Sequence, residues 1–537
     1  MVRHVFFHLT GHCAGAKATA VSAQRPISSG RAVRRGALPF PMKSDDTTPA
    51  AAPAMPSLRE RYGERYRWYL LLSVMVGTMA SIMSSTIVNV AIPGMSHHFH
   101  LLQDRAQWVT SGFMVSMTVA MLTTPWLLSR FGYRRTYVGT MVLLLAGGIA
   151  GGLANEFWLV LLARVAEGLA AGAVQPIPAI IILRAFEPHE QGRASGLFGM
   201  GVVLAPAIGP SIGGVLVDLF GWRSIFFMVV PFCLASLWAA YKFVPNTAPG
   251  GVTAERGARL DWGGLALATV GTLCLLNGLV ELRGGTPLES ALLLAGALAS
   301  LFAFIAWQKR MAANGGAPLM NLALFGYRQF AMGSIVAFIY GTALFGSTYL
   351  LPVYMQVGLQ LSASHVGTIM LPAGIVLALT IAWVGRLADR KPTWMLVSTG
   401  LALLAASFAL MLTLRLGSAI WLLVLFTGIG RLGLGFILPS LNLGSMRPLA
   451  KVLIPQGSSV INFVRMLGGA AGVSLCAIVL EWRLAAHGDS LTRAATSPAR
   501  IAAFDEVFAL LAGICAVAIF AAWQLREAPP AQPSEES

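Results

Sequence analysis

Long apolar runs of about 20 residues recur along most of the chain, and short polar segments separate them. A run of this length can cross a bilayer as a helix, which satisfies its own backbone hydrogen bonds in lipid. The pattern predicts fourteen membrane spans, over 69–92, 107–128, 136–154, 157–183, 194–217, 223–244, 262–281, 290–308, 329–351, 364–385, 394–414, 419–439, 458–480 and 506–525. We therefore expect an all-α polytopic membrane protein.

Composition supports this fold class: 56% of the 537 residues are apolar and only 11% are charged. Such a balance excludes a soluble enzyme, a disordered regulator and a disulfide scaffold. The five cysteines form no CxxC pair and four of them lie in apolar runs, so we interpret them as packing residues. Neither a Gly-rich phosphate loop nor a GxSxG nucleophile motif stands out. We expect no enzymatic activity, no cofactor and no metal site.

The formal net charge of +16 is distributed unevenly along the chain. With the N-terminus inside, the inner loops and C-terminal tail carry 17 Lys and Arg residues and the outer loops carry 7. This asymmetry predicts that both termini are cytoplasmic, in a bacterial inner (plasma) membrane. Because the excess lies on one side, topology explains it and no nucleic-acid partner is expected. Residues 1–67 are interpreted either as a disordered cytoplasmic tail or as the product of a start codon assigned too early.

Similar residues recur at offsets of 259 to 267 positions. The matched pairs are Pro93 with Pro352, Arg130 with Arg390, Arg164 with Arg431, and Gly192 with Gly457. Two parallel six-helix halves are a transporter architecture. The expected organisation is a tail (1–67), a first six-helix bundle (68–245), two inserted transmembrane helices (246–310), a second six-helix bundle (311–526) and a cytoplasmic tail (527–537).

Four ionisable residues lie well inside the predicted spans: Arg164, Glu167, Arg431 and Arg465. Charges at this depth are costly and normally face a cavity or a partner. Arg164 and Glu167 are three residues apart, so they share a helix face and can pair. This pair is interpreted either as a static anchor or as a proton relay, in which Glu167 is the candidate for reversible protonation. Arg431 and Arg465 either hold helices together or reach toward the inner surface.

Two segments carry further candidate residues. The span at 194–217 contains small residues that allow another helix to approach closely, and a proline that permits a bend. They are Gly196, Ala205, Gly209, Pro210, Gly213 and Gly214. They serve close packing alone or also seal one end of a cavity. The loop after 364–385 holds Gly385, Arg386, Asp389 and Arg390, and its acid can bind neighbouring helix N-termini. The alternative is an ordinary positive inner loop.

Over residues 68–526 these features resemble the fourteen-helix drug:proton antiporter branch of the major facilitator superfamily. The resemblance rests on the run from Ser85 to Pro93, on Arg164 with Gly168, on the small-residue span and on the loop after 364–385. The first-half loop residues that match are Arg130, Gly132, Arg134 and Arg135. The resemblance implies the major facilitator fold, with two six-helix bundles and two inserted helices.

The chain departs from this branch at three acidic or amide positions. Ser84 and Ser129 stand where the branch usually has Asp, and Glu167 stands where it usually has Gln. We expect Glu167 to take over part of the role of the acid that is missing at Ser84.

The resemblance and the buried charges together predict a proton-coupled exporter of hydrophobic or cationic small molecules, of the multidrug-efflux type. The expected substrate cavity is lined by Asn89, Gln175, Met83 and Phe113. Its partners would be the substrate, protons and membrane lipid, and a periplasmic adaptor is an open alternative. Two other functions stay open: export or import of an endogenous metabolite, and a membrane sensor that binds ligand without transporting it.

Overall fold

The computed structural model describes residues 62–101, 103–245, 259–284, 286–415, 417–490 and 497–526. Helices joined by short loops form this part of the chain, and it contains no strand. The helices are α3 (Tyr66–Phe99), α4 (Gln103–Phe131), α5 (Tyr133–Gly152), α6 (Phe157–Val174), α7 (Ile177–Ala185), α8 (Gln191–Phe220), α9 (Ser224–Phe243), α10 (Trp262–Gly284), α11 (Pro287–Ala313), α12 (Arg328–Val353), α13 (Ala363–Leu387), α14 (Thr393–Met411), α15 (Ile420–Met446), α16 (Ile454–Ala486) and α17 (Pro498–Trp523). Short turns η1 (Gly63–Arg65), η2 (Leu322–Gly326) and η3 (Tyr354–Gly358) flank them.

Every predicted apolar run lies in a helix, which confirms the all-α membrane fold class. Twelve helical segments of the described chain, with α6 and α7 taken together, are long and apolar enough to cross a membrane. The remaining predicted spans lie in α5 and α8, which have 20 and 30 residues. The largest boundary difference is at α17, which begins at Pro498, before the predicted start at 506, so Arg500 and Asp505 lie within the helix. Because these residues are polar, the hydropathy pattern placed the beginning of the helix too late.

Local sequence explains several of the helix ends. Thr286 and Ser497 each accept the backbone N–H three residues later, which starts α11 and α17 as N-caps. Gly132 separates α4 from α5 with a φ of +79°, a left-handed conformation that glycine adopts without strain. The break between α6 and α7 falls at Gln175 and Pro176, because proline has no N–H to continue the helical ladder.

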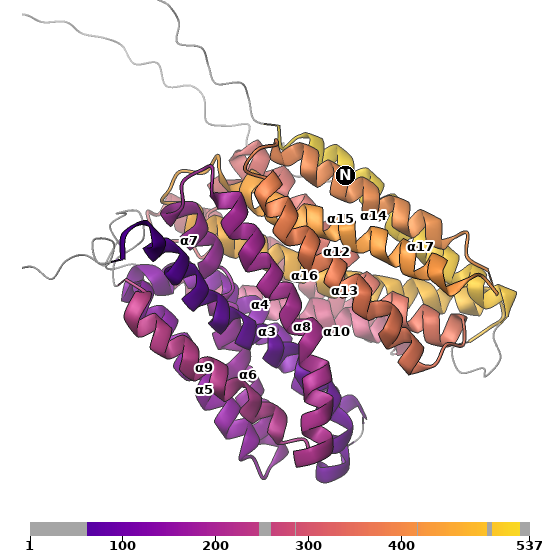
Figure 1. Ribbon diagram of the computed structural model, residues 1–537. Coiled ribbons are helices and arrows are strands. Elements are labelled where there is room, and N and C mark those ends of the chain that lie inside the picture. The colour runs from indigo at the N-terminus through magenta and orange to yellow at the C-terminus, as the bar shows by residue number, and fades with distance from the viewer. Residues whose placement is uncertain are drawn as a thin grey trace, which may run out of the picture. The chain divides into compact units, whose positions relative to one another are not determined.

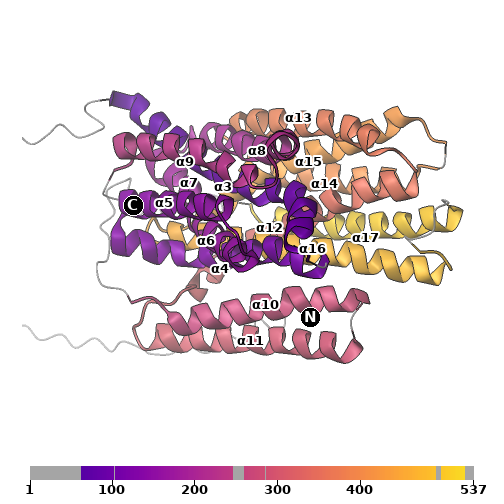
Figure 2. The same ribbon diagram turned by 90° about the horizontal axis from the view of Figure 1, so that it is seen from below.

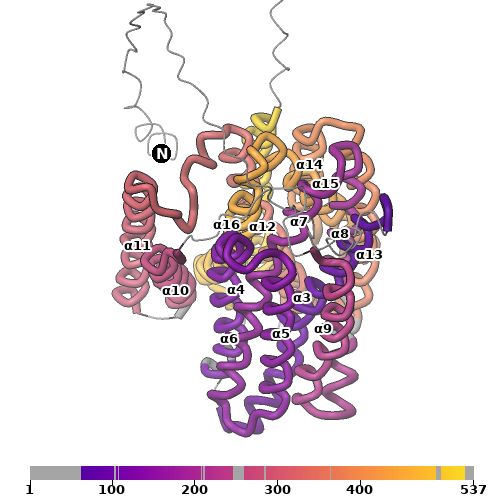
Figure 3. The backbone as a smooth tube through the Cα atoms, turned by 90° about the vertical axis from the view of Figure 1, so that its left-hand side faces the viewer, coloured from indigo at the N-terminus to yellow at the C-terminus, as the bar shows by residue number. Residues whose placement is uncertain are grey.

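The helices form two groups (Figure 1) and a separate pair (Figures 2 and 3). In the N-terminal group, α3 to α9, the main packing partners are α4 with α6, α3 with α8 and α5 with α6. In the C-terminal group, α12 to α17, they are α12 with α16 and α14 with α15. The pair α10–α11 lies beside both groups, and α10 contacts α4 of one and α16 of the other (Figures 2 and 3). The domain boundaries expected from the sequence stay a prediction.

Asp261 fixes the beginning of the α10–α11 pair. Its buried carboxylate accepts hydrogen bonds from the backbone N–H of Gly264, from Trp307 Nε1 and from Gln308 Nε2 at 2.7 to 2.8 Å. One side chain therefore caps α10 and ties it to α11. Most of the apolar residues on this pair's outer surface, such as Leu292 and Phe302, are exposed, as lipid contact requires.

The two groups meet on one face of the molecule, which we call the basic face. It carries the α4–α5, α7–α8, α13–α14 and α15–α16 connections. All six hydrogen bonds that we find between described residues of the two groups lie on this side. They include Arg184 to the carbonyl oxygen of Lys451 and Arg447 to that of Pro188. The helix groups are therefore joined at the basic face.

Candidate functional site

A buried ion pair lies at the centre of the N-terminal group. Arg164 Nη1 and Glu167 Oε2 are 2.5 Å apart, one turn from each other on α6. The side chains are 1% and 0% exposed, so water does not screen their charges. An ion pair in such surroundings loses much hydration free energy, and removal of either partner leaves an uncompensated charge. A change in the charge of Glu167 therefore changes how α6 interacts with the surrounding helices.

Ser84 on α3 bridges the pair. Its hydroxyl donates to Glu167 Oε2 at 3.0 Å, and Arg164 Nη1 donates to the same hydroxyl oxygen at 2.9 Å. Arg164 also donates to the backbone oxygens of Ser84 and Val109. The arginine thus connects α6 with both α3 and α4. Ser84 therefore belongs to this site, although sequence reasoning treated it only as the position of a missing acid.

Two polar atoms of the pair have no hydrogen-bond partner among the described residues. They are Glu167 Oε1 and Arg164 Nη2, and both are buried. Phe113 packs its ring over the Arg164 guanidinium, with 4.2 Å between the guanidinium carbon and the ring centroid. The free oxygen of Glu167 is an atom that can carry a proton without breaking an existing bond. Unsatisfied buried groups of this kind are uncommon and call for an explanation.

Glycines on α5 make room for Glu167. A Cβ added at Gly147 would lie 2.7 Å from Glu167 Cγ, and one at Gly148 would lie 2.9 Å from the backbone oxygen of Phe226. Larger residues at these positions would displace the carboxylate or α9. This contact between α5 and α6 was missed by sequence reasoning, because nothing in the spacing of the glycines points to residue 167.

The four predicted cavity residues occupy different surroundings. Met83 and Phe113 are buried, with exposed fractions of 5% and 0%. Asn89 is exposed and accepts a hydrogen bond from Thr110 at 3.3 Å. Gln175 is half-buried at the break between α6 and α7. Phe113 therefore contacts the ion pair directly, whereas Asn89 lies where water can reach it.

The small-residue span and the C-half loop come together in space. A Cβ added at Gly196 on α8 would lie 2.8 Å from the Cα of Gly385 on α13. Asp389 accepts the backbone N–H groups of Gly192 and Arg193 at 2.6 and 2.8 Å, at the first turn of α8. The partial positive charge of a helix N-terminus suits a carboxylate there. Burial nevertheless raises the pKa of Asp389 above its usual value, against the lowering effect of these two bonds.

The other residues of the small-residue span pack within the N-terminal group. Added Cβ atoms at Gly209 and Gly213 would meet Thr86 and Ile87 on α3. Ala205 is buried, whereas Gly214 has no neighbouring atom within 4 Å of an added Cβ. The side chain of Pro210 lies outside the described part of the chain.

The basic loop residues are mostly on the surface. Arg130, Arg135, Arg386 and Arg390 are exposed. Arg134 is half-buried and donates to the carbonyl oxygen of Val244, which holds the start of α5 against the end of α9.

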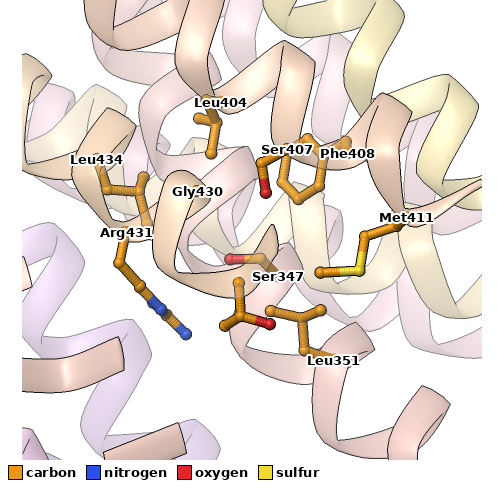
Figure 4. A pocket seen from close by; sticks show the side chains of 10 residues that line it. Ser347, Leu351, Leu404, Ser407, Phe408, Met411, Gly430, Arg431 and Leu434 are labelled. Carbon is orange, nitrogen blue, oxygen red and sulfur yellow. The ribbon is translucent and has the colours of Figure 1, made fainter. Parts of the chain in front are cut away.

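The C-terminal group holds two arginines in its interior. Arg431 on α15 is 7% exposed, and Arg465 on α16 is half-buried and donates to Asn462 Oδ1 at 2.7 Å. Arg431 borders a cavity among α12, α14 and α15 (Figure 4). Sequence reasoning found the arginines but not Tyr340, the ionisable residue on α12 that interacts electrostatically with both.

A second buried ion pair lies on the face opposite the basic face. Arg500 Nη2 and Asp489 Oδ1 are 3.1 Å apart, with side chains 0% and 3% exposed. Hydrogen bonds from Arg500, Ser497 and the backbone of Ser490 hold the pKa of Asp489 below its usual value. The pair ties the end of α16 to the start of α17. Arg500 lies between the predicted spans 458–480 and 506–525, and sequence reasoning missed this role.

Comparisons with known proteins agree with the fold. The family model of the Major Facilitator Superfamily matches residues 74–473. The chain is 27% identical over 469 residues to the uncharacterized MFS-type transporter YcnB of Bacillus subtilis, covering 86% of this chain and 95% of that one. It is 28% identical over 452 residues to a multidrug resistance protein B homolog of Mycobacterium tuberculosis, covering 82% of each. The crystal structure of the human organic anion transporter MFSD10 superposes with a TM-score of 0.61 at 16% identity, over 85% of this chain and 99% of that one. This last likeness concerns the fold alone.

Proposed function

Because the chain belongs to the Major Facilitator Superfamily, and is therefore a multi-pass membrane transporter and not an enzyme, we propose that it exports small hydrophobic molecules in exchange for protons. The feature that carries the proposal is the buried Ser84–Arg164–Glu167 cluster. The name of the mycobacterial relative, a multidrug resistance protein B homolog, supports efflux as the direction of transport. The inferred type is the fourteen-helix drug:proton antiporter.

Protonation of Glu167 is the proposed coupling step. A proton on Oε1, the oxygen without a partner, removes the negative charge that faces Arg164. Arg164 then keeps Glu167 Oε2 only as a neutral acceptor, beside the backbone oxygens of Ser84 and Val109 and the Ser84 hydroxyl. Because those acceptors lie on α3 and α4, the proton changes how strongly α6 holds its neighbours. A ligand shifts a conformational equilibrium only by its differential affinity for the two states, and the proton supplies that difference here.

Alternating access requires that the basic face open. The contacts that keep it closed are the Gly196–Gly385 crossing and the hydrogen bonds between the groups, including those from the first turn of α8 to Asp389. Opening exchanges these bonds for bonds to water, so each costs little net free energy. In the proposed cycle, the state that is closed at the basic face opens toward the opposite face.

A hydrophobic substrate fits the side chains near the interface between the groups. Met114, Met117 and Met121 on α4 cluster with Met466 on α16. Methionine side chains adapt to ligands of different shape, which suits a carrier of several compounds. Asn89 and Gln175 are the proposed polar contacts. With the basic face in the cytoplasm, as the positive-inside rule favours, both termini are cytoplasmic and the protein lies in a bacterial inner membrane. A periplasmic adaptor is a possible further component, which co-purification would detect.

Transport in proteoliposomes tests the proposal. The purified full chain is reconstituted with an imposed pH gradient, and flux is followed for ethidium (a cation), Nile red (neutral) and 2-naphthoate (an anion). We expect gradient-driven flux of at least one probe. Glu167→Gln should abolish gradient-driven accumulation while counterflow exchange of the same probe persists. Glu289→Gln, an exposed position on α11, is the matched control and should behave as the original chain does. Undiminished coupling in Glu167→Gln would overturn the role of this residue, and ligand binding without any flux would identify a sensor.

A further inference from the structure

The two interior arginines of the C-terminal group lack a carboxylate partner. Among the described residues, neither Arg431 nor Arg465 forms an ion pair. The acids of α17 have other partners: Asp505 pairs with Arg415, and Glu506 pairs with Arg483. Tyr340 is the ionisable group that interacts with both arginines. A neutral phenol does not balance two cations, so the interior of this group carries an excess positive charge.

In the N-terminal group, the arginine at the matched position has a carboxylate partner. Arg164 and Arg431 are matched positions of the repeat, on α6 and α15. Three residues after Arg164 stands Glu167, which pairs with it. Three residues after Arg431 stands Leu434, which is apolar and 1% exposed. The second half therefore keeps the arginine of the pair without its acid. A buried cation without a counter-ion is costly in a low-dielectric interior, so an anion supplied from outside would bind there favourably.

A small cavity with both apolar and polar lining residues lies next to Arg431 (Figure 4). Its volume of about 10 Å³ accommodates about one water-sized group. Three hydroxyl residues line it beside the arginine: Ser347, Ser407 and Thr427. The serine hydroxyls donate to the backbone oxygens of Leu344 and Phe426. The Thr427 hydroxyl is buried and has no hydrogen-bond partner among the described residues, so its proton is available to an acceptor in the cavity.

Arg465 lies beside the boundary between the two helix groups. The next residue, Met466, packs with Met117 and Phe113 of α4. Arg465 is half-buried, whereas Arg431 is 7% exposed. A ligand whose charged end reaches the arginines would therefore place its apolar part against the methionine cluster. The chemistry that fits both surroundings is a lipophilic compound with one small anionic group.

We propose that Arg431 and Arg465, with Tyr340 and the Thr427 hydroxyl, form a binding site for an anionic group, and that the transported compound carries this group. That the transported compound carries the anionic group rests on the proposed transport function. The binding site itself is argued from the C-terminal group alone. The site prefers anions over the cations that the sequence pattern also allowed. Carboxylates and small inorganic anions share the chemistry that an arginine and a hydroxyl recognise. A carboxylate attached to an apolar body gains the methionine contacts in addition.

Thermal unfolding of the purified full chain in detergent tests the site with three probes of one shape. They are 2-naphthoate, neutral 2-naphthamide and cationic trimethyl-2-naphthylammonium, each in potassium gluconate. We expect 2-naphthoate to raise the unfolding temperature by about 2 °C or more and the other two to have smaller effects. Arg431→Gln and Arg465→Gln should each abolish the shift. Arg431→Lys retains the charge and should keep part of it. Arg415→Gln, at an exposed arginine on the opposite face, is the matched control and should keep all of it.

The other outcomes contradict either the anion site or its link to the transported compound. An equal or larger shift from the cationic probe, or a 2-naphthoate shift that survives in both glutamine variants, would overturn the anion site. A shift produced in full by potassium chloride, to which 2-naphthoate adds nothing, would assign the site to an inorganic anion and not to the transported compound. If Arg431→Gln does not fold, Arg465→Gln and Arg431→Lys still decide. Binding is measured without a proton gradient, so a failure here leaves proton-coupled export standing, and a failure of gradient-driven flux leaves this result intact.

Discussion

The carboxylate of Asp389, just after α13, accepts the backbone N–H of Gly192, at the start of α8, at 2.6 Å. A side chain of the C-terminal group thus caps a helix of the N-terminal group. The bond exists only while the two groups are closed at the basic face. Because Asp389 lies in a loop outside the membrane spans and can exchange protons with water, this closure depends on pH.

The sign of that dependence follows from the pKa of Asp389. Burial in the closed arrangement raises the pKa above 3.8, whereas the carboxyl of the open arrangement is solvated and keeps its ordinary value. The closed arrangement therefore binds a proton more tightly. Acidification through the raised pKa favours closure, and closure weakens as the pH rises through it. The neighbouring charged groups are His189 and Arg447, together with Arg193 at the cap.

Electron-resonance distances check this prediction. Spin labels at residues 135 and 391, which are exposed on the two groups, report the separation across the basic face in a cysteine-free background. Between about pH 7 and pH 4 we expect the short-distance population to grow. Asp389→Asn keeps an acceptor oxygen but does not titrate, so its distances should stay constant over this range. Growth of the long-distance population on acidification would contradict the assignment.

The close crossing of α8 and α13 predicts that a larger side chain at the crossing destabilises the closed arrangement. Gly196→Leu would place a Cβ 2.8 Å from the Cα of Gly385, and backbone does not yield as a side chain does. Overpacking of this kind costs about 1–3 kcal/mol, which shifts the closed–open equilibrium by about 5- to 150-fold. We expect the open arrangement to dominate in the same distance measurement, with gradient-driven flux reduced at least 10-fold.

The matched control lies on the same helix. Gly214→Leu adds a side chain where no atom lies within 4 Å of the new Cβ, and helix propensity changes equally in the two variants. Its distances and flux should resemble those of the original chain. Similar effects of both substitutions would show that the helix, and not the crossing, is sensitive.

The buried cluster predicts that a carboxylate moved to position 84 restores part of the coupling. The Ser84 hydroxyl lies 2.9 Å from Arg164 Nη1, so an acid at position 84 would face the same guanidinium. Glu167→Gln should lose gradient-driven flux, and the double variant Ser84→Asp with Glu167→Gln should regain at least a tenth of it. Proteoliposome flux provides the measurement. A double variant as inactive as the single one would show that coupling needs the geometry of Glu167 itself and not merely a proton-binding acid beside Arg164.

A different outcome is expected for Ser84→Asp alone. Two carboxylates would then share one arginine in a buried site, and like charges at this distance do not both ionise. One proton should therefore remain bound throughout the cycle, so proton release during transport should fall. Indicator-dye measurements of protons released per probe transported would report this, with Ser85→Ala as a neighbouring control.

Much of the fold could be predicted from the sequence. The positions of the helices follow from hydropathy, because each bilayer-spanning run must satisfy its own backbone and therefore forms a helix wherever it is long enough. The pairing of Arg164 with Glu167 follows from their spacing of three residues on one helix. The repeat of Arg164 and Arg431 is likewise a property of the chain alone. Where polar residues lie in the first turns of a helix, as Arg500 and Asp505 do in α17, the same rule places the boundary too late.

The tertiary structure decided which of these residues meet. Gly196 and Gly385 are far apart in the sequence, yet a Cβ added to either would lie within 2.8 Å of the other's Cα, because small residues on two helices permit close approach. Ser84 bridges the ion pair from another helix, and the cavity beside Arg431 draws its hydroxyls from three helices. A periodic pattern specifies which face of a helix is apolar, but not which neighbour covers it. Helix formation is local, so it can be predicted from one segment of the sequence. These contacts depend on packing between segments that no single stretch of sequence contains.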